Sequence, residues 1–446
     1  MKGRLIYILF VLSGLCSLIH ATPLSLGDAV HLALKNNPDV AAADRDILVI
    51  NTKLPQIHAR ERVQATAEAG VMHLEKVPTL DVPPIILPLP SQLGGPQQVS
   101  LPSFPLAAQN TTTLTLTAHL PLSTGGRTRY AAKQVHEATA ALTARAESTR
   151  REVALAVTRA YLGVVLAQRV AEVSEEAYST VGRHVTQAEA LLKAGLIPKY
   201  DLIRAQTELA NSDRRRLDAQ NQIDLAYAYL MALIGQPEDE RPTLTTPLDG
   251  QAVMETELPQ LLQTAEAASS DMHALQALDR MYLAGAQAAR AETHPIVALV
   301  AKEEVLRDDL PLTTPVGYLG LVVQVPLLDG GMAKAKAAEQ HALRERNASD
   351  VDRLQNGIQL EVRKYYLDLT SARKALQAAD QALALAQENL RLATRRFEVG
   401  EGNSIEQVDA VLTLSLTETN QASARYQYDL AFYGLKKATG EILGLF

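Results

Sequence analysis

Pro121-Leu122-Ser123-Thr124-Gly125-Gly126 returns, 205 residues further along the chain, as Pro326-Leu327-Leu328-Asp329-Gly330-Gly331. The same offset holds without a gap for over a hundred positions. A period this long is too large for a stacking solenoid unit. Each copy is therefore a whole structural half, and we expect the two halves to build matching parts side by side. Further pairs at this offset are Tyr161 and Tyr366, Gly195 and Gly400, Asp224 and Asp429, and Gly235 and Gly440.

The residues before each Gly-Gly corner alternate with a period of two, which predicts a strand with one apolar and one polar face. Leu114 and Leu116 occupy the apolar face in the first copy, and the offset places Leu321 on the same face in the second. The polar face carries Thr113, Thr115, Thr117 and His119 in the first copy and Gln324 in the second. Four strands are expected in all, at residues 63–72, 112–120, 296–302 and 316–325.

Each corner is followed by helical sequence, and no proline interrupts it between Gly126 and Pro198. About 67 residues at ~1.5 Å each predict a helix of about 100 Å. Glycine at a helix end and proline near the next start are typical of a turn, so each long helix is expected to fold back as a hairpin. Two shorter helices are expected at 24–54 and 261–292. The hairpin turns are Gly195-Leu196-Ile197-Pro198 and Gly400-Glu401-Gly402-Asn403.

Residues 77–110 separate the first two expected strands. They contain eight prolines, which cannot donate a backbone hydrogen bond and are rare inside sheets. We therefore expect a long loop here and no strand. Ile85-Ile86-Leu87, within this loop, is apolar enough to contact lipid or to fill an opening.

Residues 1–21 have the features of a signal peptide. Lys2 and Arg4 precede an apolar run that ends at Ile19-His20-Ala21, where cleavage is expected. Cys16, the only cysteine, lies inside this segment, so the mature chain has no thiol for disulfides, thiolate metal sites or nucleophilic catalysis. Lipid attachment at Cys16 is the alternative, and Leu15 disfavours it because a lipid-anchored cysteine normally follows a small residue. Loss of the two basic residues moves the formal net charge from −7 to −9, which disfavours binding to nucleic acid.

The mature sequence carries no pattern of catalytic or metal-binding residues. The ten histidines are scattered, and the Gly-Gly corners lack the Lys-Ser/Thr of a phosphate-binding loop. We therefore expect no enzyme activity, no cofactor and no metal. The expected organisation is a signal peptide (1–21), a first repeat (22–235), a linker (236–259), a second repeat (260–440) and a short tail (441–446).

Four strands are too few to close a barrel, for which about eight is the practical minimum. An open sheet would expose both its apolar face and two unpaired edges. Three copies would supply twelve strands and resolve both problems, with the polar face lining a water-filled lumen. The predicted fold class is therefore mainly α with a small β part: duplicated long helical hairpins form a trimeric α-helical barrel, topped by a transmembrane β-barrel with four strands per protomer.

The paired Pro-Leu-x-x-Gly-Gly corners and the two turns resemble those of the TolC-like outer-membrane efflux family of Gram-negative bacteria. The most diagnostic segment is Phe397-Glu398-Val399-Gly400, followed by Ile405-Glu406 and Asp409-Ala410. The resemblance covers the chain from Leu24 to Gly440. It implies a homotrimer that spans the outer-membrane lipid and continues as a helical tunnel in the periplasm. It also implies two partners, a periplasmic adaptor protein and an inner-membrane pump of the RND, ABC or MFS type.

By the same resemblance, the chain is a passive exit duct of a tripartite efflux pump or of a type I secretion system. The alternative from another class is a secreted or surface coiled-coil adhesin. An adhesin accounts for the long helices and the export signal, but not for the paired alternating strands. The residues do not distinguish drug efflux, metal efflux and protein secretion.

Acidic residues near the two turns form the candidate pore-lining site. Glu406 and Asp409 are three residues apart and share a helix face, and Asp201 is the repeat equivalent of Glu406. The resemblance implies rings of these carboxylates at the periplasmic aperture, where they favour cations. A solvated helix face, where the helix dipole stabilises acids, is the alternative. The turn residues Gly195, Gly400 and Gly402 are the expected adaptor contacts.

The second turn departs from the family pattern. The family usually has an aromatic residue with a hydroxyl and a basic residue there, and these tether the closed mouth. Phe397 and Gly402 occupy the two positions in this chain. Arg204, the repeat equivalent of Asp409, is a basic residue on the other hairpin that can replace the missing contact. The sequence therefore leaves open how the mouth is held closed.

Overall fold

The structure is a computed structural model, and it describes residues 23–250, 256–308, 315–399 and 401–446. The expected signal peptide and Gly400 lie outside the described residues. The chain divides into two compact units, and each unit takes segments from both sequence repeats. The first unit contains the residues up to Asp44, 144–272 and 353–446, and the second contains 45–143 and 273–352.

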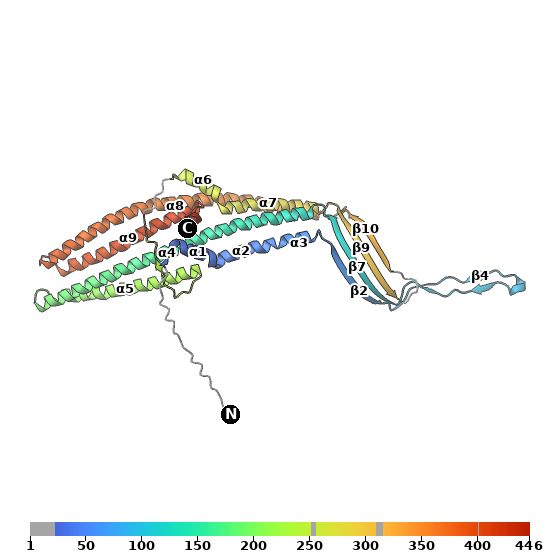
Figure 1. The fold of residues 1–446 in the computed structure, drawn as a ribbon, viewed down its shortest axis with the longest axis horizontal. Coiled ribbons are helices and arrows are strands. Elements are labelled where there is room, and N and C mark those ends of the chain that lie inside the picture. The colour runs from blue at the N-terminus through green and yellow to red at the C-terminus, as the bar shows by residue number, and fades with distance from the viewer. Residues whose placement is uncertain (1–22, 251–255, 309–314, 400) are drawn as a thin grey trace, which may run out of the picture. The chain divides into compact units, whose positions relative to one another are not determined.

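Two long helices of equal length dominate the chain (Figure 1). Each has 67 residues, and their first and last residues differ by the offset of the sequence repeat. A shorter helix follows each one and returns beside it, as the sequence predicted. The bounds are Arg127–Lys193 for α4, Lys199–Ile234 for α5, Met332–Glu398 for α8 and Ser404–Ala438 for α9.

Glycines with left-handed backbone conformation precede both long helices. Gly125 and Gly126 have φ angles of 63° and 88°, and Gly330 and Gly331 have nearly the same angles, 64° and 85°. Residues with a Cβ rarely adopt this conformation. A Cβ on Gly125 would also lie 2.7 Å from Cβ of His294, so the first corner has no room for a side chain.

The two shorter helices that the sequence predicted are each broken, which corrects the expectations for 24–54 and 261–292. Pro38 disfavours helical backbone at the residue before it, and Asn37 is extended. Ser269 is also extended, and its hydroxyl accepts the N–H of Met272 at 3.2 Å. The resulting helices are α1 (Leu26–Asn36), α2 (Pro38–Asn51), α3 (Lys53–Ala59), α6 (Leu258–Ala268) and α7 (Ser270–Ala291).

The largest core cluster of the first unit surrounds Tyr161, which is fully buried in α4. Its hydroxyl donates to the carbonyl of Leu24 and accepts the N–H of Thr246, both at 2.9 Å. These bonds secure a short parallel strand pair that the sequence analysis did not predict. The elements joined here are β1 (Pro23–Leu24), β8 (Thr243–Leu244) and the 3-10 helix η2 (Ile442–Leu445).

Two aspartates related by the repeat hold the segment between the halves. Asp429 is buried, and its carboxylate accepts the N–H groups of Asp249 and Gly250 at 3.0 and 2.9 Å. Burial raises the pKa of Asp429 to about 6, although the two N–H groups act in the opposite direction. Asp224, the repeat equivalent, forms an exposed ion pair with Arg241 at 3.7 Å. The repeat therefore supplies two anchors for this segment, one buried and one exposed.

The second unit contains a four-stranded antiparallel sheet in the order β10-β9-β7-β2, with two strands from each repeat. Leu116 lies opposite Ala67 on one side and Glu303 on the other, so Glu303 is a charged residue on the leucine face. Arg307, opposite Thr112 at the end of the strand, is a second one. Leu114 and Leu116 are exposed, whereas Thr113, Thr115 and Thr117, which alternate with them, are partly covered. The strands are β2 (Gln64–His73), β7 (Asn110–Ser123), β9 (Ile296–Asp308) and β10 (Val316–Gln324).

The proline-rich residues 77–110 form two short antiparallel strand pairs, so the expectation of a loop without strands is wrong. Seven of the eight prolines lie outside the four strands, and Pro105 stands at the end of a two-residue strand, where no ladder N–H is needed. The segment joins β2 to β7 as a long hairpin (Figure 1). Its elements are β3 (Thr79–Leu80), β4 (Ile85–Leu87), η1 (Ser91–Leu93), β5 (Gln97–Val99) and β6 (Phe104–Pro105).

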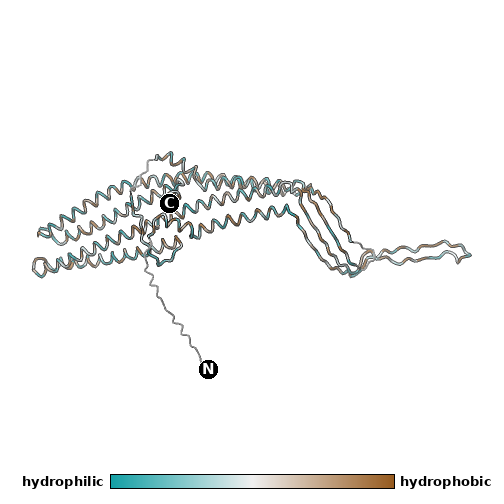
Figure 2. Tube along the Cα trace, viewed as in Figure 1, coloured by the Kyte–Doolittle hydropathy of each residue, from teal (hydrophilic) through white to brown (hydrophobic). Residues whose placement is uncertain are grey.

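One window of α4 is long and apolar enough to cross a membrane by composition alone. Half of that window is buried within the protein, and Val157, Tyr161 and Val164 of α4 belong to the core cluster. Apolar and polar residues alternate along the long helices (Figure 2). The apolar side chains of α4 therefore serve helix packing.

Substitution of Gly434 tests how closely α8 and α9 approach each other. A Cβ at this position would clash with the ring of Tyr365, so we expect Gly434→Ala to destabilise the protein by about 1–3 kcal/mol through overpacking. The matched control is Gly163→Ala in α4, where a Cβ would meet nothing within 4 Å, and a gain of about 0.5–1 kcal/mol is expected. The measurement is the apparent melting temperature in detergent, and equal shifts for the two variants would contradict this packing.

Candidate functional site

Main-chain hydrogen bonds shape the second hairpin turn. Two of the candidate acids, Glu406 and Asp409, come directly after this turn. The N–H groups of Glu401 and Gly402 both donate to the carbonyl of Arg396 at 2.9 Å. A Cβ on Gly402 would lie 3.0 Å from the backbone nitrogen of Phe397, so glycine suits this position. Asn403 then starts α9, because its side chain accepts the N–H of Glu406 at 2.8 Å.

The first hairpin turn ends α4 through two reverse hydrogen bonds. Gly195 donates to the carbonyl of Leu192, and Leu196 donates to that of Leu191, both at 2.9 Å. The φ angle of Gly195 is 74°, which satisfies the left-handed position of such a helix end. Asp201 lies in the first turn of the next helix, α5, where an acid is stabilised by the helix dipole.

The structure separates Glu406 from the other two candidate acids. Glu406 is exposed, and its Oε2 lies 3.6 Å from Nη1 of Arg396 on α8. Asp409 and Asp201 instead line a groove of about 370 Å3 between α5 and α9, together with Arg204. Among the described residues, no ion pair joins Arg204 to either acid. Glu406 is therefore held to its own hairpin, whereas Asp409, Asp201 and Arg204 face one groove.

A buried histidine joins the two hairpins near their turns, and the sequence analysis did not find it. His184 of α4 is only 4% exposed, and its Nε2 lies 2.5 Å from Oγ of Ser404 on α9. The ring of Phe397 on α8 packs edge-on against it, with 5.2 Å between the ring centroids. Phe397 thus reaches the other hairpin through ring packing, although it lacks the hydroxyl that the family pattern has.

The surroundings of His184 favour its neutral form. Its Nδ1 and the Oε1 atom of Gln407 are both buried without a hydrogen-bond partner among the described residues. Burial lowers the pKa of His184, because the charged ring loses its hydration there. The Gln407 side chain acts on this pKa in the opposite direction, but burial is the larger cause, so the neutral ring is favoured.

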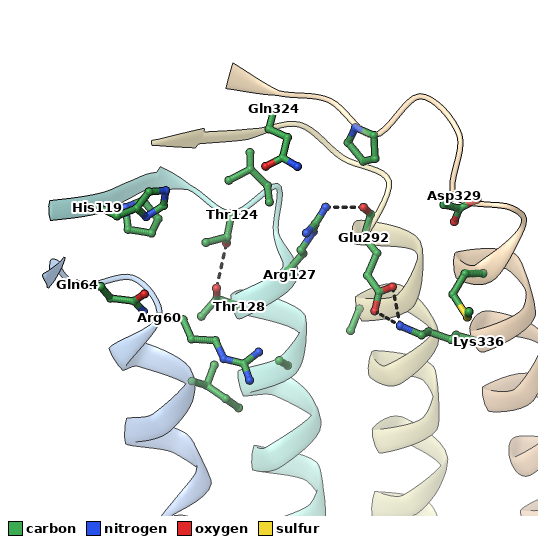
Figure 3. A pocket seen from close by; sticks show the side chains of 17 residues that line it. Arg60, Gln64, His119, Thr124, Arg127, Thr128, Glu292, Gln324, Asp329 and Lys336 are labelled. Atoms are coloured by element: carbon green, nitrogen blue, oxygen red, sulfur yellow. Dashed lines mark hydrogen bonds and ion pairs between the residues drawn. The ribbon is translucent and has the colours of Figure 1, made fainter. Parts of the chain in front are cut away.

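A cavity of about 900 Å3 lies where the sheet meets the helices of the second unit (Figure 3). The strands contribute His119 and Gln324, so two of the predicted lumen residues come together here. Arg60 and Arg127 reach the same cavity from the helical side. Polar and charged side chains from both repeats therefore meet at the junction of strands and helices.

Most charges around this cavity have partners within the unit. Arg127 donates to the carbonyl of Ala291 at 3.1 Å and to that of Glu292. The Glu292 carboxylate is in turn paired with Lys336 at 2.8 Å. Asp329 accepts the backbone N–H groups of residues 331 and 333, and these bonds lower its pKa. The ion pairs and the capped helix start fix the geometry of the junction.

The three predicted lumen threonines, Thr113, Thr115 and Thr117, precede His119 on β7. They lie outside the cavity, on one face of the sheet. Thr115 lies opposite Glu68 on β2 and Glu304 on β9. Glu304 is paired with Lys302 of the same strand at 2.6 Å. The polar face therefore carries Glu68 and Lys302, which lie within the predicted strands. It also carries Glu304, which the prediction missed because β9 continues past the predicted end at 302.

Comparison with known proteins agrees with this geometry. The profile of the outer membrane efflux protein family matches residues 105–236 and 261–441. The chain is 22% identical over 302 residues to outer membrane protein TolC of Vibrio cholerae, covering 66% of this chain and 69% of that protein. It is also 22% identical over 295 residues to outer membrane efflux protein BepC of Brucella suis, covering 64% of this chain and 62% of that protein.

Solved structures show the same fold. The Campylobacter jejuni CmeC outer membrane channel matches with a TM-score of 0.74 at 15% identity, over 94% of this chain and 86% of that chain. The Neisseria gonorrhoeae MtrE outer membrane channel matches with a TM-score of 0.73 at 18% identity, over 94% of this chain and 89% of that chain. At these identities the likeness concerns the fold.

Paired helical hairpins joined to a strand set with open edges define an outer-membrane channel of Gram-negative bacteria with a periplasmic helical barrel. The chain belongs to the outer membrane efflux protein family. The mainly α fold with a small β part and the outer-membrane location are thereby confirmed, and the assembly of three copies stays a prediction. The alternative of a coiled-coil adhesin is not supported.

The pH dependence of stability tests the contact at His184. Because burial lowers its pKa, the unfolded chain takes up this proton more readily, and stability falls as the pH drops below about 6.5, the ordinary histidine value. We expect the apparent melting temperature to fall less between pH 7.5 and pH 5.5 in His184→Gln than in the wild type. Asp429 has the opposite slope, since its pKa is raised, but contributes equally to both proteins. An equal fall in both would show that His184 is not buried in its neutral form.

Proposed function

We propose that three copies of this chain enclose one channel, which works as the outer-membrane exit duct of a tripartite efflux pump or a type I secretion system. The observation that carries this proposal is the four-stranded sheet with two open edges, β10 and β2. Backbone groups on such edges have no partner in lipid, so a spanning sheet must close on itself. Twelve strands from three copies close it, and family members work as trimers.

The repeat suggests how one copy meets the next. Inside the chain, the corner at Gly125 packs against His294 and Pro295, which precede β9. The equivalent corner at Gly330 has nothing within 4 Å of a Cβ position. The segment before β2 stands in the same relation to its strand as His294 does to β9. In the trimer, Arg62 of a neighbouring copy would therefore occupy the space beside Gly330.

The two faces of the sheet would then have different surroundings. Leu114, Leu116 and Leu321 are exposed in the single chain, and on a barrel they would face lipid. The polar face would line the lumen, with His119 and Gln324 where the barrel meets the helical tunnel. Thr113, Thr115 and Thr117 would line the barrel above them. Solutes would cross the outer membrane along this polar path.

The duct is passive and needs partners that supply energy. The family is one of channels without catalysis, and its members work with periplasmic adaptor proteins and inner-membrane pumps. The turn residues Gly195 and Gly402, with Gly400 outside the described residues, would contact the adaptor at the periplasmic end. The inner-membrane pump would be of the RND, ABC or MFS type.

Carboxylates near the turns would set the charge of the periplasmic aperture. Asp409 and Asp201 already share one groove with Arg204, and Glu406 stands one helical turn before Asp409. Three copies would arrange each acid as a ring around the axis. Rings of fixed negative charge attract cations, and multivalent cations most strongly.

Removing two of these acids tests the aperture. We expect Glu406→Ala combined with Asp409→Ala to lower cation selectivity in planar-bilayer recordings and to relieve block by trivalent cations, because six carboxylates leave the narrow opening. The field of the intact rings should weaken as salt rises. Trimer assembly should persist, since exposed carboxylates on a helix contribute little to stability.

Asp380→Ala is the control, because Asp380 is an exposed acid on the shaft of α8 that accepts a hydrogen bond from Gln421 at 2.8 Å. This variant should keep wild-type selectivity. If the double variant also kept wild-type selectivity and block, the acids would be ordinary solvated residues and the proposed aperture would be wrong.

A further inference from the structure

The segment between β2 and β7 presents apolar side chains that nothing in the described chain covers. We call residues 77–106 the apolar hairpin. Ile85, Ile86 and Leu87 of β4 are 51%, 66% and 47% exposed, and Phe104 is 50% exposed. Asp81 is the one charged residue of this range. In Figure 2 hydrophobic stretches of the hairpin trace alternate with pale and hydrophilic ones.

Water alone is a poor environment for this hairpin. A two-stranded hairpin is marginally stable in water unless a further layer covers one of its faces. Its two strand pairs contain only two and three residues per strand. Contiguous exposed apolar surface on such a scaffold indicates an interaction site.

The hydrocarbon of the membrane is also excluded as the environment of the apolar hairpin. The strand pairs β3–β6 and β4–β5 each have two open edges, and backbone groups on open edges cannot be satisfied in lipid. The partner must therefore cover the side chains while it leaves the edges in contact with water. A protein surface at the water-facing end of the barrel meets this requirement.

The position of the hairpin in the sheet identifies that protein surface. The hairpin continues from β2, which is an edge strand of the four-stranded sheet, so it stands at the seam with the next copy. This placement rests on the proposed trimer. Three hairpins would then surround one axis, and with only Asp81 charged in each they would repel one another little.

We propose that the apolar hairpins of the three copies pack against one another beyond the barrel and narrow its outer mouth. The face that makes the contact is the one that carries Ile85, Leu87 and Val99. Ile85 lies opposite Val99 and Leu87 lies opposite Gln97, so these side chains project to the same side. Gln98 lies opposite Ile86 and projects to the other side.

The prolines favour side-chain packing over strand addition at this contact. Eight prolines within residues 77–110 lack a backbone N–H, which weakens the edges as templates for a further strand. Three hairpins therefore meet through their apolar faces without merging into one sheet. Such a contact can open without breaking a hydrogen-bonded ladder, which suits an outer mouth that must pass solutes.

Single-cysteine cross-linking tests the contact. Cys16 lies in the expected signal peptide, so Val99→Cys and Gln98→Cys each place one thiol in the mature chain. On oxidation we expect Val99→Cys to lose most of its single-chain band to a two-chain product on non-reducing gels. Gln98→Cys, on the opposite face of the same strand, should stay single-chain. Both substitutions leave the four barrel strands unchanged.

Labelling with a water-soluble maleimide separates the alternatives. An unlinked Val99→Cys that reacts as fast as Gln98→Cys would show a hairpin free in water, and an unlinked Val99→Cys that resists labelling would show a hairpin in lipid. Either result overturns the proposal while the trimer, seen on a native gel, still stands. Absence of the trimer itself would overturn the proposed function as well.

Discussion

The unpaired backbone along β10 and β2 is the constraint on which the rest of the assembly depends. Each edge strand presents N–H and C=O groups that water can satisfy but lipid cannot. The sheet takes two strands from each repeat, so a single chain always has one internal β7–β9 junction and two open edges. Closure between copies, as proposed, would remove the edges and would bring the helical hairpins of the copies together around one axis.

The two repeats share a backbone but use it differently. Asp329 caps α8 through the N–H groups of residues 331 and 333, whereas its equivalent, Thr124, accepts a hydrogen bond from Thr128 at 3.0 Å. Gly434 admits the ring of Tyr365, whereas its equivalent on the first hairpin is Tyr229. Equal lengths of α4 and α8 therefore coexist with unequal contacts. The differences allow the two hairpins of one chain to take distinct places around a channel.

Sequence periodicity predicted the elements well and the contacts between distant residues poorly. The four strands and both 67-residue helices follow from alternation and from the Gly-Gly corners, which are local signals. The helix breaks at Asn37 and Ser269 and the strands of the proline-rich hairpin were missed, because short extended segments leave little pattern. The contact of His184 with Ser404 joins residues 220 positions apart, and no local pattern reveals it. The acids at 201, 406 and 409 remain predictions about an aperture.

The seam between copies, where β10 of one copy would pair with β2 of the next, gives the most direct test of the account through its register. Leu116 lies opposite Glu303 at the internal junction. Leu321 is the repeat equivalent of Leu116. Val71 stands seven residues after the start of β2, as Glu303 does after the start of β9, so Leu321 is expected opposite Val71 of the next copy. Leu321→Cys with Val71→Cys should therefore oxidise to a covalent three-chain ring, whereas Leu321→Cys with Met72→Cys should not. Single chains only, or an open ladder of higher multiples, would contradict closure of the barrel by three copies.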